Sequence, residues 1–265
     1  MSVILEISSP AFPDAYIITE TTPSTVAFDG SSGSLGSISA TVFVEETYDM
    51  VNNELIITDS RLLSKDEVMA IGVDNFAPLS EVPMPRAATI TRGRLTITFS
   101  GVYNTSNGVS CNLTGTAHWD DSGLHTEGEN YCATGEDFIG VTWSGSFTAK
   151  SHSISGKNQL GGALTIYNSD STPNAGRVWS FKDSNPTSKY TLYAKDINLN
   201  VNISKNTLTG NGNTAEAVLK YIHTYSKVKG SISITPGSET VAGSFSLSNT
   251  DRQWSLVCTV TNIPY

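Results

Sequence analysis

The stretch ATITRGRLTITFSGVYNTSNGVSCNLTGTA, residues 88–117, decides the fold class of this chain. In its first part, threonines separate the apolar side chains of Leu95, Ile97 and Phe99. A period of two residues is typical of a β-strand with one buried and one exposed face, and asparagine and glycine, as in residues 104–108, favour turns. We therefore expect β-strands at residues 88–99 and 109–117.

The same short runs of apolar and β-branched residues, bounded by Gly, Pro, Asn or Asp, recur along the whole chain. Each run has the length and residue types of a strand rather than a helix. Beyond the two strands above, the pattern predicts strands at residues 3–7, 37–44, 54–58, 138–149, 162–167, 178–181, 190–203, 230–235, 241–248 and 253–261.

Two segments rich in asparagine predict hairpin turns. Asn52 and Asn53 separate two runs of strand-forming residues, and the segment 206–213 contains Gly210 and Gly212. Asparagine and glycine tolerate the positive φ angles that tight hairpins require, so we expect the flanking strands to pair at both places.

Helix signals are few. Ser64 and Glu67 have the spacing of a capping box immediately before an apolar run, which predicts a short helix at about residues 64–72. The segment 213–228 fits two alternatives, because its apolar residues form a helical stripe but also alternate as in a strand through Tyr221 and His223.

These patterns together predict an all-β protein, either a large antiparallel β-sandwich or two packed β-units, with at most two short helices. Composition agrees, since 66 of the 265 residues are serine or threonine and only 15% are charged. The protein is expected to be soluble, because the longest apolar runs are far shorter than a membrane-spanning helix requires.

Charge is distributed unevenly along the chain. Residues 1–149 hold 19 acids and 5 bases, whereas residues 150–265 hold 6 acids and 11 bases. This change suggests an acidic β-unit at 1–150 and a mildly basic β-unit at 151–265, with a single domain as the alternative. The net charge of −9 argues against a nucleic-acid partner. The two halves are expected to attract each other, either within one molecule or between molecules as salt-sensitive self-association.

The amino terminus lacks a basic first region and carries Glu6 within its apolar stretch, which argues against a classical signal peptide. A cytoplasmic location or export by a non-classical route is therefore expected. Among the three cysteines, the spacing of Cys111 and Cys132 is compatible with a disulfide across neighbouring strands, while Cys258 lies in an apolar strand. The alternative is three buried, reduced thiols.

The segment HWDDSGLHTEGENYCATGEDF, residues 118–138, is the densest candidate for a functional site. Aromatic rings beside carboxylates suit sugar recognition, because a ring stacks on the apolar face of a pyranose while carboxylates accept hydrogen bonds from its hydroxyls. Oxygen-rich loops of this kind also hold Ca²⁺, and an acidic hairpin with an inward-facing tryptophan is the purely structural alternative. The candidate ligand-binding residues are Trp119, Asp120, Asp121, His125, Glu127, Tyr131 and Trp143.

Standard catalytic motifs are absent from the sequence, and the four histidines form no closely spaced group with cysteines. A transition-metal site would need distant residues to converge. The leading hypothesis is a non-enzymatic binding protein for a glycan or other cell-surface ligand. The alternatives are a pore-forming β-toxin, whose membrane hairpin would come from 190–203 and 214–235, and a glycoside hydrolase that uses two carboxylates.

Overall fold

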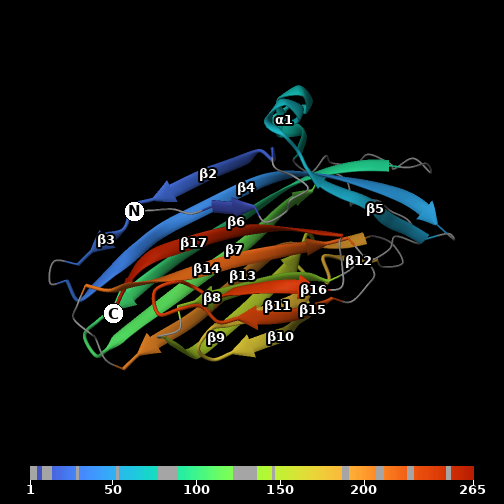
Figure 1. The fold of residues 1–265 in the computed structure, drawn as a ribbon. Coiled ribbons are helices and arrows are strands. Elements are labelled where there is room, and N and C mark those ends of the chain that lie inside the picture. Colours follow the sequence, from blue (N-terminus) through green and yellow to red (C-terminus); the bar gives the residue numbers. More distant parts are fainter. Residues whose placement is uncertain are drawn as a thin grey trace.

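The computed structural model is a β-sandwich of two large sheets with a short hairpin on one outer face (Figure 1). The structure describes residues 5–7, 14–27, 30–51, 54–76, 89–121, 136–144, 147–186, 191–206, 212–225, 230–248 and 252–265. The predicted all-β class, in its sandwich form, is confirmed. Within the described residues, no helix is long and apolar enough to cross a membrane.

Among the described residues, the larger sheet has nine strands, and β12, β13, β7, β6, β4 and β2 lie side by side in that order. β3 and β5 also pair with β4, and β9 also pairs with β13. All of these pairs are antiparallel. The strands are β2 (Ile17–Thr22), β3 (Thr25–Val26), β4 (Ser32–Val51), β5 (Glu54–Leu62), β6 (Thr89–Asn104), β7 (Val109–Asp121), β9 (Thr148–Asn158), β12 (Ser184–Pro186) and β13 (Thr191–Lys205).

In the part of the chain that the structure describes, the smaller sheet has six antiparallel strands in the order β1, β17, β14, β8, β11 and β10. β8 is buried along its whole length, because its second face lies under the β15–β16 hairpin. The strands are β1 (Leu5–Ile7), β8 (Asp137–Trp143), β10 (Ile166–Thr172), β11 (Gly176–Phe181), β14 (Thr214–Thr224) and β17 (Gln253–Pro264), with β15 (Ser231–Thr235) and β16 (Ser244–Ser248) in the covering hairpin.

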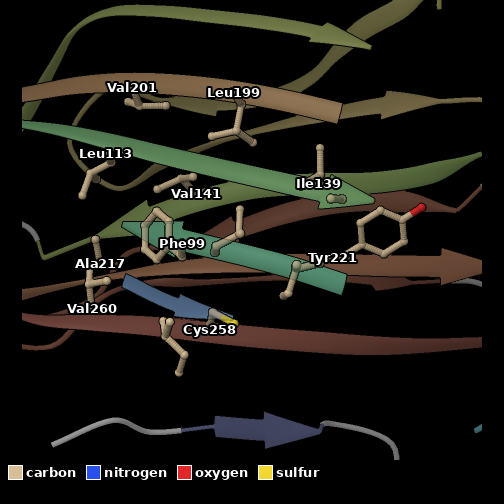
Figure 2. Packing of buried hydrophobic residues seen from close by; sticks show 14 of the residues in the cluster. Phe99, Leu113, Ile139, Val141, Leu199, Val201, Ala217, Tyr221, Cys258 and Val260 are labelled. Carbon is tan, nitrogen blue, oxygen red and sulfur yellow. The ribbon is translucent and has the colours of Figure 1, made fainter. Parts of the chain in front are cut away.

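The main core lies between the two sheets, where the inward side chains of both interdigitate (Figure 2). Leu95, Ile97 and Phe99, the alternating residues of the opening stretch, are all fully buried there. Burial of large apolar side chains stabilises the fold by roughly 1.5–3 kcal/mol each relative to exposure. The sandwich therefore follows directly from the period of two that the sequence shows.

The predicted helix is present as α1 (Lys65–Ile71), followed by the 3-10 helix η1 (Val73–Phe76). Both halves of the capping box form, since the Ser64 side chain accepts from the Glu67 N–H and the Glu67 carboxylate accepts from the Ser64 N–H. Val68 and Phe76 pack with Phe43, which points outward from β4. A small separate core thus holds the two helices on the outer face of the larger sheet.

The hairpin predicted at residues 52–53 is confirmed, because β4 and β5 pair with Val51 opposite Glu54. The ambiguous segment 213–228 forms strand β14 over Thr214–Thr224. The hairpin predicted at 206–213 is wrong. β13 belongs to the larger sheet and β14 to the smaller one, so the chain passes from one sheet to the other there.

The two sequence halves share both sheets. β13 of the second half pairs with β7 of the first, and β14 of the second half pairs with β8 of the first. β9 begins at Thr148 and continues to Asn158, so it crosses residue 150 without interruption. The change of charge along the chain is therefore not matched by a break in the sheets.

Cys111 and Cys258 are both free thiols buried in the main core. Burial raises the pKa of each thiol to about 12, because the thiolate would lose its hydration there. The free, core-facing Cys258 is as predicted. Of the two alternatives for Cys111, the buried reduced thiol is the one found; Cys132 lies outside the described residues.

Candidate functional site at one end of the sandwich

Strands from both sheets bring polar side chains together at one end of the sandwich. Trp119 occupies an inward position near the end of β7, and Asp137 the first inward position of β8. Tyr221 and His223 continue the inward alternation of β14. Because these positions face the interior, the polar groups must find partners among themselves.

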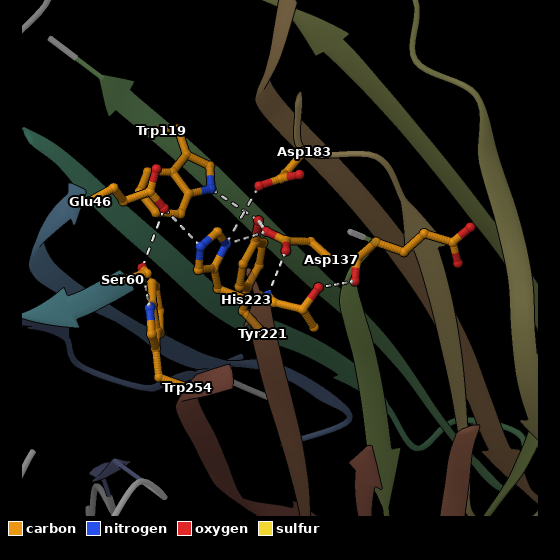
Figure 3. Close-up of polar contacts among 10 residues, drawn as sticks. Glu46, Ser60, Trp119, Asp137, Asp183, Tyr221, His223 and Trp254 are labelled. Atoms are coloured by element: carbon orange, nitrogen blue, oxygen red, sulfur yellow. Dashed lines mark hydrogen bonds and ion pairs between the residues drawn. The ribbon is translucent and has the colours of Figure 1, made fainter. Parts of the chain in front are cut away.

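His223 is the centre of this cluster (Figure 3). Its Nδ1 lies 3.0 Å from an Asp137 carboxylate oxygen and its Nε2 lies 2.9 Å from a Glu46 carboxylate oxygen. Burial alone would lower the pKa of His223, but the charges and hydrogen bonds of Asp137 and Glu46 raise that pKa well above its usual value. Since Glu46 lies on β4, the imidazole links the two sheets.

Asp137 is fully buried and accepts several hydrogen bonds. The Tyr221 hydroxyl donates to the same oxygen that faces His223, and the Thr224 N–H donates to the other oxygen at 2.9 Å. Burial, followed by the negative charge of Asp137, raises the pKa of Tyr221 well above its usual value. The Tyr221 hydroxyl therefore keeps its proton and acts as a donor.

Two tryptophans complete the links between the sheets. Trp119 on β7 donates its indole N–H to the Tyr221 oxygen at 3.0 Å, and Trp254 on β17 donates to the Ser60 oxygen on β5 at 3.1 Å. Ser60 in turn donates to Glu46 at 3.3 Å. Both indole rings also pack against the His223 ring, with centroids 5.7 and 5.0 Å away.

The outer face of the larger sheet carries a second polar group next to this end. His118 lies between two carboxylates, with Nδ1 2.6 Å from Asp196 and Nε2 3.1 Å from Asp120. Arg94 donates to the other oxygen of Asp120. Burial raises the pKa of Asp120, but the hydrogen bonds and charges of Arg94 and His118 outweigh it and hold that pKa below its usual range.

Rows of uncharged polar side chains continue across the same outer face. The strand registers align β4, β6, β7, β13 and β9 so that one outward residue from each lies beside the next. Neighbouring hydroxyls pair across strands, as in Ser39 with Thr98 and Thr41 with Thr96, both at 2.8 Å. We call this surface the hydroxyl face, and its two central rows are Ser39, Thr98, Thr116, Asn198 and Ser155, then Ser37, Ser100, Thr114, Asn200 and Ser153.

The candidate residues of the sequence lie in different environments. Trp119 is only 9% exposed and Trp143 is fully buried, and the Trp143 indole donates to the Phe147 carbonyl at 3.1 Å. Both rings therefore pack in the core, because β7 and β8 turn these alternate positions inward. Asp120 lies on the outer face, and Asp121 ends β7. The remaining three candidates, His125, Glu127 and Tyr131, lie outside the described residues.

The central residues of the buried cluster, Glu46, Asp183 and His223, were not predicted as site residues. They are far apart in sequence, with 177 positions between Glu46 and His223. A signal was nevertheless present, since His223 continues the inward alternation of β14 and Glu46 that of β4. A titratable residue at a core-facing strand position requires a hydrogen-bond or ion-pair partner. Such a residue is therefore a candidate for a functional site.

No protein-family model and no curated protein matches this chain. Among solved structures, the chain has a weak likeness to one reported under the heading of pH-induced modulation of Streptococcus parasanguinis adhesion by Fap1 fimbriae. The TM-score is 0.29 at 11% identity, covering 63% of this chain and 80% of that chain. A second likeness is to the collagen adhesin CNA from S. aureus, with a TM-score of 0.27 at 8% identity, covering 86% of this chain and 94% of that chain.

Proposed function

We propose that this protein is a non-enzymatic binding protein that recognises a glycan or a similar neutral, hydroxyl-rich ligand on a cell surface. The hydroxyl face is the observation that carries the proposal. Its central rows present serine, threonine and asparagine side chains without a lysine, arginine or carboxylate among them. Hydroxyl and amide groups both donate and accept hydrogen bonds, as the hydroxyls of a sugar do.

The spacing of these groups suits an extended ligand. Neighbouring strands lie about 4.8 Å apart, and alternate residues along a strand lie about 6.7 Å apart, so the face repeats in two directions. Asn198 and Ser155 are exposed, and Thr98 and Thr116 are half-buried. A chain of sugar residues laid across the strands would meet a new hydroxyl or amide at each strand.

Charged groups at the edge of the hydroxyl face add selectivity. His118, Asp120 and Asp196 follow the central rows on the same side of the sheet, and the His118 side chain is 41% exposed. Carboxylates accept hydrogen bonds from sugar hydroxyls, and His118, between Asp120 and Asp196, holds both carboxylates in place. The segment 122–135, which continues from this edge, retains its proposed role in ligand or Ca²⁺ binding.

The two alternative functions receive less support. The strands expected to form a toxin hairpin, β13 and β14, do not pair with each other and lie inside different sheets. For the hydrolase, Asp137 is fully buried and its two oxygens already accept hydrogen bonds from Tyr221 and Thr224. A glycosidase needs its acid and its second carboxylate on either side of an accessible substrate bond.

A glycan-array screen with matched threonine variants tests the proposal. Thr98→Val and Thr116→Val each remove one hydroxyl from the hydroxyl face while keeping a β-branched side chain of similar shape. Thr235→Val on β15 removes an exposed hydroxyl elsewhere and serves as the control. We expect binding of a neutral glycan that falls about tenfold in the first two variants, equivalent to about 1.4 kcal/mol, and is unchanged in the control.

Two outcomes would overturn the proposal. One is the absence of glycan binding by the unvaried protein. The other is equal binding by all three variants and the unvaried protein, which would place the ligand on another surface. Melting curves of each variant confirm that any loss of binding comes from the removed hydroxyl rather than from unfolding.

A further inference from the structure

We propose that Asp137, Asp183 and His223 form a binding site for a divalent transition-metal ion, with Zn²⁺ as the best-suited occupant. This site lies inside the sandwich and is independent of the hydroxyl face. Each residue offers one ligand atom, and the three atoms all lie within 4.8 Å of one another. The three residues come from β8, from the position two residues after β11, and from β14.

The distances suit a tetrahedral ion. Zn²⁺ bonds to nitrogen and carboxylate oxygen are about 2.0–2.2 Å, which places neighbouring ligand atoms of a tetrahedron about 3.4 Å apart. The Nδ1 atom of His223 lies 3.0 Å from the Asp137 oxygen and 3.7 Å from the Asp183 oxygen. Both distances are within about 0.4 Å of that value, and the two aspartate oxygens lie no more than 4.8 Å apart, so they would move toward each other around one ion.

Glu46 orients the imidazole for this role. Its carboxylate lies 2.9 Å from Nε2 of His223, on the side of the ring opposite to the two aspartates. Histidines that bind metal ions usually donate their other N–H to a carboxylate, which fixes the tautomer and strengthens the ligand. With the Nε2 proton directed to Glu46, the Nδ1 atom faces Asp137 and Asp183.

This geometry suits a cation at Nδ1 when the Nε2 proton is directed to Glu46. In the neutral tautomer that donates to Glu46, Nδ1 would direct a lone pair at two carboxylate oxygens, which are also acceptors. Either a second imidazole proton or a metal ion must therefore lie between them. A proton on Nδ1 bonds to Asp137 at 3.0 Å and lies beyond hydrogen-bond distance of the Asp183 oxygen at 3.7 Å, whereas a metal ion would draw on all three ligand atoms.

The chemical type of the ligand atoms indicates which ion would bind, and the exposure of the three side chains indicates from which side it would enter. One imidazole and two carboxylates favour Zn²⁺ over Ca²⁺, which prefers six to eight oxygen ligands. The His223 and Asp137 side chains are 2% and 0% exposed, while that of Asp183 is 13% exposed. An ion would therefore reach the site from the Asp183 side.

Zinc titration of the metal-stripped chain, followed by calorimetry and by the metal content of the dialysed protein, tests this proposal. We expect one ion per chain, a higher melting temperature with zinc, and no competition from Ca²⁺. Because the ion must displace the imidazole proton, its affinity should rise by up to tenfold for each pH unit while His223 is protonated.

Two variants distinguish the buried site from the surface. Asp183→Asn keeps the shape of the most exposed ligand but weakens its bond to the metal, so we expect at least a tenfold loss of zinc affinity. His118→Gln is the matched control, because His118 also lies between two carboxylates but on the outer face, and this variant should bind zinc normally.

Nitrogen-15 spectra of the histidine rings in the unvaried protein give a readout that does not depend on a variant folding. Zinc should change the Nδ1 signal of His223 from that of a protonated nitrogen to that of a metal-bound one. The proposal is overturned if no stoichiometric ion binds, if His118→Gln removes the ion, or if the Nδ1 proton remains in excess zinc. The first and last outcomes would show that the cluster holds a proton only.

Discussion

At the scale of single residues, His223 links the two sheets through its two ring nitrogens. Its imidazole contacts Glu46 on β4 of the larger sheet and Asp137 on β8 of the smaller one. Both carboxylates raise the pKa of His223, so the protonated ring is the form that the fold stabilises. Removing one partner of a buried ion pair typically costs about 3–5 kcal/mol, because the remaining charge is left buried.

We predict that the stability supplied by His223 decreases at alkaline pH. The folded-state pKa lies above the unfolded value of about 6.5, so the contribution is fully present below that pH and is lost as the pH rises through the folded-state pKa. His223→Gln should therefore lower the free energy of unfolding by about 3 kcal/mol in mild acid, and by progressively less as the pH is raised.

Denaturant unfolding of the metal-free protein, from mild acid to alkaline pH, measures the effect. His118→Gln is the control, because His118 also lies between two carboxylates but its side chain is 41% exposed, where ion pairs contribute little. A constant gap between the unvaried protein and His223→Gln at all pH values would contradict the assignment of a buried imidazolium.

The sequence located part of this cluster, but not its centre. Trp119 and Asp137 fall within the segment that aromatic and acidic residues marked as functional. The cluster around His223 could not be predicted from sequence spacing. Its residues come from strands β4, β7, β8 and β14 and from the loop after β11, which are far apart in sequence. The local signal was that His223 takes an inward position if the segment 213–228 is a strand. The alternative interpretation of that segment as a helix obscured this signal.

At the scale of elements, local signals predicted what local interactions control. The capping box identified α1 because Ser64 and Glu67 satisfy each other within one turn. The Ser64 N–H, followed by Arg61, lowers the pKa of Glu67 to about 2, so this carboxylate supports the helix above about pH 4.5 and loses that role only as the pH falls through about 2.

We predict that Ser64→Ala weakens α1 by about 1 kcal/mol, because the first-turn N–H groups lose their capping acceptor. Amide hydrogen exchange in residues 65–71 should then be about fivefold faster, while exchange in the central strands stays unchanged. Ser153→Ala, at an exposed position of β9, is the control for loss of a serine hydroxyl. Unchanged exchange in the helix would mean that packing on Phe43, rather than the cap, holds α1 in place.

Pairing between distant elements was less predictable. Gly212 lies in the connection between β13 and β14, and Gly210 lies outside the described residues; a connection of this kind can return the chain to the same sheet or send it to the facing one. Both adjoining strands have the same alternation, so the sequence pattern fits either connection. The choice depends on which neighbours complete each sheet, with β7 and β9 beside β13, and β8 and β17 beside β14.

At the scale of the whole molecule, the shared sheets bring the acidic and basic parts of the chain into one body. Arginines 61, 92 and 94 form ion pairs with acidic residues of the first half. His223 of the second half contacts the carboxylates of Glu46 and Asp137, which belong to the first half. This arrangement favours attraction within one molecule, and salt-sensitive self-association stays a prediction.

The two buried thiols provide a test of whether the sandwich unfolds as one unit. Cys111 lies on β7 of the larger sheet and Cys258 on β17 of the smaller one, and both belong to the same core. Their pKa values of about 12 and their burial prevent reaction with a thiol reagent unless the sheets separate.

In a Cys132→Ser background, we therefore predict that both thiols react with one rate constant. That rate constant should rise with denaturant concentration in parallel with global unfolding. As the control, the fully unfolded chain should react with two equivalents of the thiol reagent. Rapid labelling of either thiol in native buffer would show that one sheet opens independently of the other.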